Sequence, residues 1–341
     1  MKIHILFELK PGASGGGNQF LKALRKYLTG IRCYAEHPGD ADAILFNSYQ
    51  YIPETVAAKK RYPKKIFVHR IDGPIRLYNR KSDRRDLVTN CANHLVADAT
   101  IFQSSWSQTE NYRLGLKRNR FETVIMNAPD PTIFNRDGKA PFAATGKIRL
   151  IATSWSPNWN KGFEVYQWLD RNLDFEKYEM AFIGRSPTAF KNISITQPLG
   201  SIGLAEHLKN SDIFITASLK DPCSNSLIEA LHCGLPALAI NEGGHPEIVR
   251  QGGLLFNDPG EIPQMLDRIS IDYQAFQRCI DMPTIDAVGQ VYHGFMASIH
   301  EAVEGGSYRP KRFSFIDSCK VSAVIAAWRW AERLSAIKNY L

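Results

Sequence analysis

Two carboxylic acids bracket a predicted helix start in the segment KDPCSNSLIEALHCGLPALA, residues 220–239. Asp221 precedes the helix, and Glu229 lies inside it eight positions later. Between them, Ser224, Asn225 and Ser226 supply helix caps beside the N–H groups that a first turn leaves unpaired. Because the start of a helix attracts negative charge, the segment predicts an anion-binding site with an acid on each side.

The chain then returns to a strand and enters a loop with two glycines. Residues 234–236, Gly-Leu-Pro, end the helix, and 237–240 form an apolar strand. In the loop NEGGHPEIV that follows, Gly243 and Gly244 allow close approach of the backbone to a ligand, and Glu247 is predicted to begin a short helix. We expect this loop to lie beside residues 220–229.

A run of three glycines lies between the first predicted strand and the first predicted helix, in KPGASGGGNQF (10–20). Gly16 and Gly17 let the backbone approach a phosphate or a sugar at a helix start. The run matches neither a dinucleotide-binding fingerprint nor a P-loop, and a flexible connection has the same composition.

A lysine stands at a helix start in the loop SWSPNWNKGFEV, which begins at Ser154. Lys161 there can neutralise a diphosphate together with the helix dipole. Trp155 and Trp159 of the same loop either stack on a base or sugar or pack internally.

A histidine stands at the predicted carboxyl end of the strand 65–69, followed by Arg70 and Asp72 in an H-R-x-D-G sequence. Ligands of open α/β sheets bind beyond the carboxyl ends of the strands. We therefore predict that His69 hydrogen-bonds a sugar hydroxyl or relays a proton, and that Arg70 and Asp72 contact a second substrate. A lone histidine is otherwise most often structural.

Short apolar strands alternate with helical patterns, which is typical of parallel sheets covered by helices. The pattern predicts an α/β protein with two Rossmann-like, doubly wound domains facing a cleft. We expect the first domain at 1–140, the second at 148–310, and a C-terminal helix at 311–341 that packs back on the first domain. The Gly-, Pro- and Ala-rich stretch 135–147 is the predicted linker.

The predicted elements follow this division. Those of the first domain are strands at 3–8, 43–47, 65–69, 100–103 and 123–126 and helices at 19–28, 53–61, 83–96 and 106–114. Those of the second are strands at 148–153, 180–183, 213–216, 237–240 and 253–256 and helices at 163–171, 204–210, 224–233 and 261–269. A last amphipathic helix is predicted at 320–338.

Positive charge is concentrated in the first half of the 341-residue chain, whose formal net charge is +8. Residues 1–147 hold 24 Lys+Arg against 13 Asp+Glu, a net charge of +11, whereas residues 148–341 hold 18 against 21, a net charge of −3. The basic clusters 59–65, 76–85 and 113–120 predict an anionic partner, unless they only solubilise helix faces. No nucleic-acid-binding signature accompanies them.

Composition is that of a globular protein, with 44% hydrophobic and 22% charged residues. No apolar run approaches the roughly 20 residues of a membrane-spanning helix, and the N-terminus lacks a signal-peptide pattern. We expect a cytoplasmic protein whose basic first domain contacts the inner membrane face. The six cysteines, Cys223 of the acid-flanked segment among them, lack metal-ligand spacing, so reduced thiols and no metal site are predicted.

These pieces, in this order, resemble the nucleotide-sugar-dependent glycosyltransferases of the GT-B fold, in particular the large retaining glycosyltransferase family 4. The hallmark of that family is an acid, seven residues, a glutamate and Ala-x-x-x-Gly-x-Pro, matched here by Asp221, Glu229, Ala230, Gly234 and Pro236. The similarity extends to Gly243–Gly244, Glu247, Lys161–Gly162 and the N-terminal glycine run, and so covers most of residues 1–260.

The resemblance implies a role for each of these residues. Glu229 holds the ribose hydroxyls of a nucleotide, and Asp221 faces the donor sugar. Lys161 offsets the charge that grows on the leaving diphosphate, with His69 near the reacting centre. The other donor-binding residues implied are Gly16, Gly17, Ser154, Asn225, Ser226 and Gly244, and the acceptor-binding residues are Arg70 and Asp72.

Two positions depart from the family pattern. The first acid is commonly Glu in the family and is Asp221 here, one methylene shorter, which leaves the donor sugar open. Ser156 stands where the family usually has an arginine five residues before the phosphate-binding lysine. We expect another cation to compensate, with Arg185 as the candidate.

The resemblance implies transfer of a sugar from a UDP- or GDP-sugar to a hydroxyl of an acceptor that is a glycan or lipid-linked, and anionic. Retention of configuration and independence of metal and of any further cofactor are also implied. Three other functions stay open: a nucleotide-sugar epimerase or hydrolase of the same fold, a degenerate GT-B binding or scaffold protein, and nucleic-acid binding, which rests on charge alone.

Overall fold

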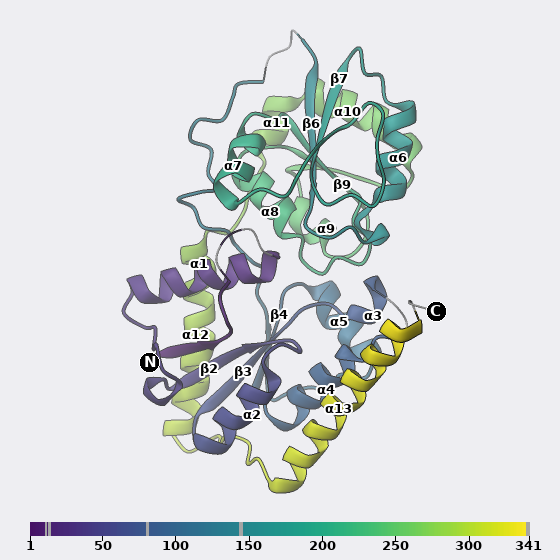
Figure 1. Cartoon of the computed structure of the whole chain (residues 1–341). Coiled ribbons are helices and arrows are strands. Elements are labelled where there is room, and N and C mark those ends of the chain that lie inside the picture. Colours follow the sequence, from purple (N-terminus) through teal and green to yellow (C-terminus); the bar gives the residue numbers. More distant parts are fainter. Residues whose placement is uncertain (11, 13–14, 80–81, 143–145, 339–341) are drawn as a thin grey trace. The chain divides into compact units, whose positions relative to one another are not determined.

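The computed structural model describes residues 1–10, 12, 15–79, 82–142 and 146–338 (Figure 1). The chain forms two compact units. Unit 1 comprises residues 1–8, 24–126 and 286–341, and unit 2 comprises 9–23 and 127–285. Of the predicted features, residues 11, 13 and 14 of the glycine loop, 80–81 of a basic cluster, 143–145 of the linker and 339–341 of the C-terminal segment lie outside the described residues.

Unit 1 contains a five-stranded parallel sheet in the order β1-β2-β3-β4-β5. Its strands are β1 (Ile3–Leu6), β2 (Ala43–Asn47), β3 (Ile66–Ile71), β4 (Ala99–Phe102) and β5 (Phe121–Val124). Its helices are α2 (Ile52–Arg61), α3 (Ile75–Tyr78), α4 (Arg85–Leu95), α5 (Ser105–Arg113), α12 (Ile285–Glu304) and α13 (Phe315–Lys338), while α1 (Gly16–Gly30) has its first half in unit 2. The five predicted strands are confirmed: 43–47 matches β2 at both ends, and the ends of the other four shift by at most two residues.

Two C-terminal helices complete unit 1. In α13, Val321 and Ile325 are 1% and 8% exposed and join the core formed with α4 (Figure 1). In α12, a helix that the sequence did not predict, Gly289 lies against Tyr27 so closely that a Cβ would come within 2.2 Å of its ring. A larger side chain would therefore force these helices apart.

Unit 2 contains a six-stranded parallel sheet in the order β11-β10-β9-β6-β7-β8. Its strands are β6 (Ile148–Ser154), β7 (Tyr178–Gly184), β8 (Ser194–Thr196), β9 (Ile213–Thr216), β10 (Ala237–Ile240) and β11 (Gly253–Phe256). Its longer helices are α6 (Phe163–Asn172), α7 (Ser201–Lys209), α8 (Asn225–His232) and α10 (Ile262–Ile271), and α9 (His245–Val249) and α11 (Tyr273–Arg278) are short. The edge strand β8 is the one strand here that the sequence did not predict.

The stretch predicted as a linker packs on unit 2 in its described part. The Ala140 N–H donates to the Lys209 carbonyl at 2.9 Å, and the Arg136 guanidinium donates to the Gln277 carbonyl at 3.4 Å. Within the described part of the chain, no helix is both long and apolar enough to cross a membrane.

Candidate functional site

The carboxyl edge of the unit 2 sheet joins a lysine to the first acid of the predicted site. Gly162 has a φ of +93°, and a Cβ there would lie 2.5 Å from the Cβ of Ala217, so only glycine lets the loop after β6 approach the loop after β9. The Lys161 ammonium consequently reaches the Asp221 carboxylate at 3.0 Å. Two of the predicted site residues are thus brought together, with 32% and 11% of the two side chains exposed.

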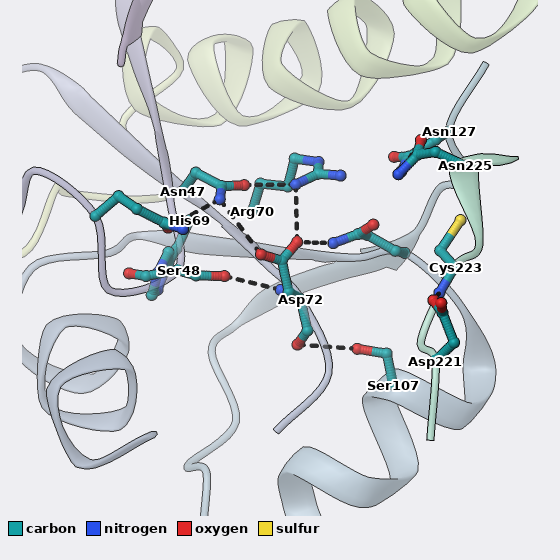
Figure 2. Close-up of polar contacts among 12 residues, drawn as sticks. Asn47, Ser48, His69, Arg70, Asp72, Ser107, Asn127, Asp221, Cys223 and Asn225 are labelled. Carbon is teal, nitrogen blue, oxygen red and sulfur yellow. Dashed lines mark hydrogen bonds and ion pairs between the residues drawn. The ribbon is translucent and has the colours of Figure 1, made fainter. Parts of the chain in front are cut away.

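Asp221 is held as an anion by its surroundings. Burial alone would raise the pKa of its carboxyl, but the charges of Lys161 and His245 and a hydrogen bond from the Cys223 N–H at 3.3 Å bring the pKa below its ordinary value. The Ser218 hydroxyl also donates to it, at 3.2 Å. Figure 2 draws Asp221 and Cys223 on the segment that leads into α8.

The loop 241–249 lies beside Asp221, which confirms the expectation that it adjoins residues 220–229. The Gly244 N–H donates to the Asp221 carbonyl at 2.8 Å. Gly243 has a φ of +66°, and a Cβ there would lie 2.4 Å from the same oxygen. The short helix α9 begins at His245, two residues before the predicted start at Glu247.

His245 is a member of this cluster that sequence reasoning passed over. Its side chain is fully buried, with Nδ1 bonded to the Ile240 carbonyl at 3.1 Å and Nε2 without a hydrogen-bond partner among the described residues. Burial lowers the pKa of the imidazole, while Asp221 opposes that shift. The sequence signal was its position directly after the two glycines that contact Asp221.

Glu229, the second acid, is a buried carboxylate in the middle of α8. The residue is 8% exposed, and its carboxylate has no hydrogen bond or ion pair with any residue that the structure describes. Burial raises its pKa to about 8. Because a buried charge without a partner is costly, this group is suited to accept hydrogen bonds from a ligand.

The start of α8 meets the N-terminal glycine loop within unit 2. A Cβ at Gly16 would lie 2.3 Å from the Asn225 amide nitrogen, so the glycine allows the two segments to touch. The Asn127 amide donates to the Asn225 Oδ1 at 3.1 Å (Figure 2), and the Ser224 and Ser226 hydroxyls are 3.3 Å apart. A Cβ at Gly17 would meet no atom within 4 Å.

Arg185, the candidate replacement for the family arginine, lies beside the loop after β6. Its N–H donates to the Ser154 carbonyl at 3.1 Å, and its guanidinium stacks over Trp155 at 4.4 Å. The Ser154 hydroxyl bonds the Ser156 carbonyl at 2.8 Å, which folds the loop back on itself. A cation is thus present beside the loop after β6, supplied by the residue that follows β7.

His69 lies in the interior of unit 1 and not at a strand end. The strand end predicted at His69 is wrong by two residues, because β3 continues to Ile71. The imidazole is 0% exposed, stacks on Phe46, and contacts the Asn93 side chain at 3.2 Å and the Ser48 carbonyl at 2.8 Å. Burial lowers its pKa to about 4. The predicted catalytic role of His69 therefore has no support in this geometry.

Asp72 occupies the strand end instead and joins three neighbouring strands (Figure 2). Its carboxylate accepts hydrogen bonds from Arg70 at 3.0 Å, from Gln103 after β4, and from Asn47 at the end of β2 at 3.5 Å. Its N–H donates to the Ser48 hydroxyl at 2.9 Å. Because 29% of the Asp72 side chain is exposed whereas Arg70 is buried, the carboxylate is the group available to a ligand.

Comparison with known proteins gives a family match in unit 2. A model of the family described as "Glycosyl transferases group 1" matches residues 169–272, the segment that contains Asp221 and Glu229. A phosphatidylinositol N-acetylglucosaminyltransferase subunit of Homo sapiens is 25% identical over an alignment of 182 residues that covers 49% of this chain. The match spans only 36% of that relative's length.

Solved structures share the fold over nearly the whole chain. Sucrose-phosphate synthase from Thermosynechococcus elongatus superposes with a TM-score of 0.63 at 13% identity, over 89% of this chain and 99% of that one. HepE of Anabaena in complex with UDP-glucose superposes with a TM-score of 0.60 at 15% identity, over 98% of this chain and 99% of that one. The catalytic domain of starch synthase IV from Arabidopsis thaliana superposes with a TM-score of 0.65 at 11% identity, over 88% of this chain and 99% of that one.

Two Rossmann-like units in this order define the class, the GT-B fold, and the fold predicted from the sequence is confirmed. The family match in unit 2, together with these neighbours, supports a glycosyltransferase.

Proposed function

We propose that this chain transfers a sugar from a nucleoside diphosphate sugar to a hydroxyl group. The observation that carries the proposal is the Glu229 carboxylate, which is buried, has a pKa raised to about 8 and has no partner among the described residues. A ribose offers two adjacent O–H donors, which match the two oxygens of a carboxylate.

The remaining groups of unit 2 fit the rest of such a donor. The start of α8, with Asn225 and Ser226, offers N–H and side-chain donors for a diphosphate. Lys161 supplies a positive charge, and Asp221 faces the hydroxyls of the donor sugar. The other residues that we assign to the donor are Gly16, Gly17, Ser154 and Gly244, with Arg185 as a second cation.

The reaction breaks the bond between the anomeric carbon and the diphosphate oxygen. The bonding electron pair leaves with the diphosphate, so negative charge grows there in the transition state, and Lys161 and the α8 amides stabilise that charge. The acceptor oxygen forms the new bond to the anomeric carbon, and its proton passes to the departing phosphate oxygen. We propose retention of configuration, with attack from the side of the leaving group, and no requirement for a metal.

The acceptor is assigned to unit 1. The partly exposed Asp72, positioned by Arg70, can accept a hydrogen bond from an acceptor hydroxyl. The net charge of +11 over residues 1–147 favours an anionic acceptor, a glycan or a lipid-linked molecule at the inner membrane face. The name of the human relative, which couples phosphatidylinositol with N-acetylglucosaminyl transfer, agrees with this class.

A UDP- or GDP-sugar is the proposed donor. HepE has been solved with UDP-glucose and with UDP, which supports a uridine nucleotide. Calorimetry with UDP, GDP and ADP tests the donor site. We expect one of them to bind the native chain and to bind Glu229→Ala at least tenfold more weakly, because a charge-assisted hydrogen-bond pair is lost.

Glu206→Ala is the matched control, since Glu206 is an exposed acid on α7 of the same unit. Equal affinity of the native chain and Glu229→Ala would contradict the donor assignment. Consumption of the donor sugar without any acceptor would indicate an epimerase or hydrolase, and nucleotide binding without turnover of any donor would indicate a binding protein.

A further inference from the structure

A groove with a volume of about 540 Å³ lies on unit 1 between α2 and α13. Its floor is apolar, with Val56 of α2 and Val321 and Ile325 of α13, and Trp330 lies along one side. Val321 and Ile325 also pack into the core on α4. The rotation of α13 about its axis is therefore fixed, and one face of it is held outward.

Large apolar side chains stand on that outward face. Phe315, Ile316, Trp330 and Leu334 are 82%, 65%, 67% and 43% exposed. Single exposed hydrophobic residues are ordinary on protein surfaces, but Trp330 and Leu334 are four positions apart and so neighbours on the helix, and Trp330 borders the apolar groove. Aromatic residues of this kind are enriched where a protein meets the headgroup layer of a bilayer.

The rim of the groove is basic. Lys60 of α2 and Arg329 and Arg333 of α13 line it. Among the exposed residues of α13 that the structure describes, none is acidic, since Asp317 and Glu332 are half-buried. Lys60 belongs to the basic cluster 59–65, in which Arg61 and Lys64 are exposed as well.

We propose that this groove and the outward face of α13 dock the chain on a bilayer that contains anionic phospholipids. The cations attract the phosphate-bearing surface, and Trp330 and its apolar neighbours enter the headgroup layer. A soluble polyanion matches the cations but gives Phe315 and Trp330 no apolar environment, which is why we favour a lipid surface. The inference deepens the proposed function, because it names the surface that brings a lipid-linked acceptor to unit 1.

Co-sedimentation with vesicles of neutral phosphatidylcholine, with and without phosphatidylserine, tests the proposal. The native chain should bind the anionic vesicles and lose binding as salt rises. Each cation near an anionic surface changes partitioning about fivefold, so Arg329→Gln/Arg333→Gln should bind about thirtyfold more weakly. Trp330→Ala should weaken binding as well but keep the native salt dependence, because it leaves the charges unchanged.

Lys2→Gln/Lys26→Gln is the matched control, with the same loss of charge at exposed positions of unit 1 that do not line the groove. Negligible binding of the native chain to both kinds of vesicle would overturn the proposal, and so would equal losses in the control and the arginine variant. Binding to heparin but not to vesicles would reject the bilayer as the occupant. Nucleotide affinity measured without vesicles should stay native in all these variants, which separates this proposal from the donor site.

Discussion

Replacing Glu229 by glutamine should stabilise unit 2 relative to the native chain, by an amount that grows as the pH rises, and should weaken nucleotide binding. The Glu229 carboxyl has an ordinary pKa of 4.5 when unfolded and about 8 when folded. The folded state therefore holds its proton over a range in which the unfolded state has lost it, and the native chain loses stability as pH rises from 4.5 to 8. Glutamine is neutral throughout.

The size of the effect follows from the two pKa values. At 1.36 kcal/mol per pKa unit, the penalty from Glu229 is roughly 1 kcal/mol at pH 5 and roughly 4 kcal/mol at pH 7.5. The free energy of unfolding of Glu229→Gln, relative to the native chain, should thus rise by about 3 kcal/mol between these pH values. The fixed cost of burying the amide cancels from this difference.

The assay is urea unfolding at pH 5 and 7.5. Hydrogen exchange of the α8 amides serves as the probe of unfolding, so that unit 2 is observed by itself. Glu206→Gln, exposed on α7, should show no such change. A stability difference between Glu229→Gln and the native chain that is the same at both pH values would refute the argument, because it would mean that the carboxylate is already ionised and solvated in the folded state.

Three other predictions concern the same two units. Lys161→Met should lower kcat about 10²- to 10³-fold in a transfer assay, because the leaving diphosphate loses its cation, whereas Lys177→Met at the exposed pair with Asp267 should be near native. Native kcat in Lys161→Met would reject the role of Lys161. Burial lowers the pKa of His69 from 6.5 to about 4, so the free energy of unfolding of the native chain should fall by roughly 2 kcal/mol between pH 8 and pH 5, and that of His69→Gln should not show this fall. The kcat of His69→Gln should be native. A large fall in kcat alone would restore the catalytic role of His69. Nucleotide binding at pH 7 should release about 0.9 proton from Glu229, because a carboxyl with a pKa of about 8 is mostly protonated at that pH and ribose hydroxyls favour its ionised form. Calorimetry in buffers of different ionisation enthalpy measures the number of protons released. Proton uptake on binding would contradict the prediction.

Much of the fold was predictable because the central strands β2, β3, β4 and β9 are fully buried and therefore rich in apolar residues. Strand ends were less predictable. Arg70 is charged, so the apolar run stops before it, yet an ion pair with Asp72 and a bond to Asn47 allow it to be buried and β3 to continue to Ile71. This is why His69 was expected at the edge of the sheet and is found inside it.

Helix α12 was not predicted from the sequence because it contains glycine. In α12, the buried residues Ile285, Val288, Tyr292, Met296 and Ile299 recur at helical spacing, but Gly289 lowers the intrinsic helix propensity. Its small size serves the contact with Tyr27, more than 250 positions earlier in the chain.

The candidate site was predictable where it depends on spacing along the chain. Asp221 and the start of α8 are examples. The ion pair with Lys161 and the lack of a partner for Glu229 depend on three-dimensional contacts that spacing does not encode. For α13, periodicity indicated an amphipathic helix, but only packing on α4 decides that Trp330 faces outward.

The most direct test of the account compares a nucleoside diphosphate with its 2′,3′-dideoxy counterpart, by calorimetry, in the native chain and in Glu229→Ala. If the buried carboxylate holds the ribose hydroxyls, removing them should weaken binding to the native chain ten- to a hundredfold and leave binding to the variant nearly unchanged. Equal losses in both proteins would contradict the assignment of Glu229 to the ribose.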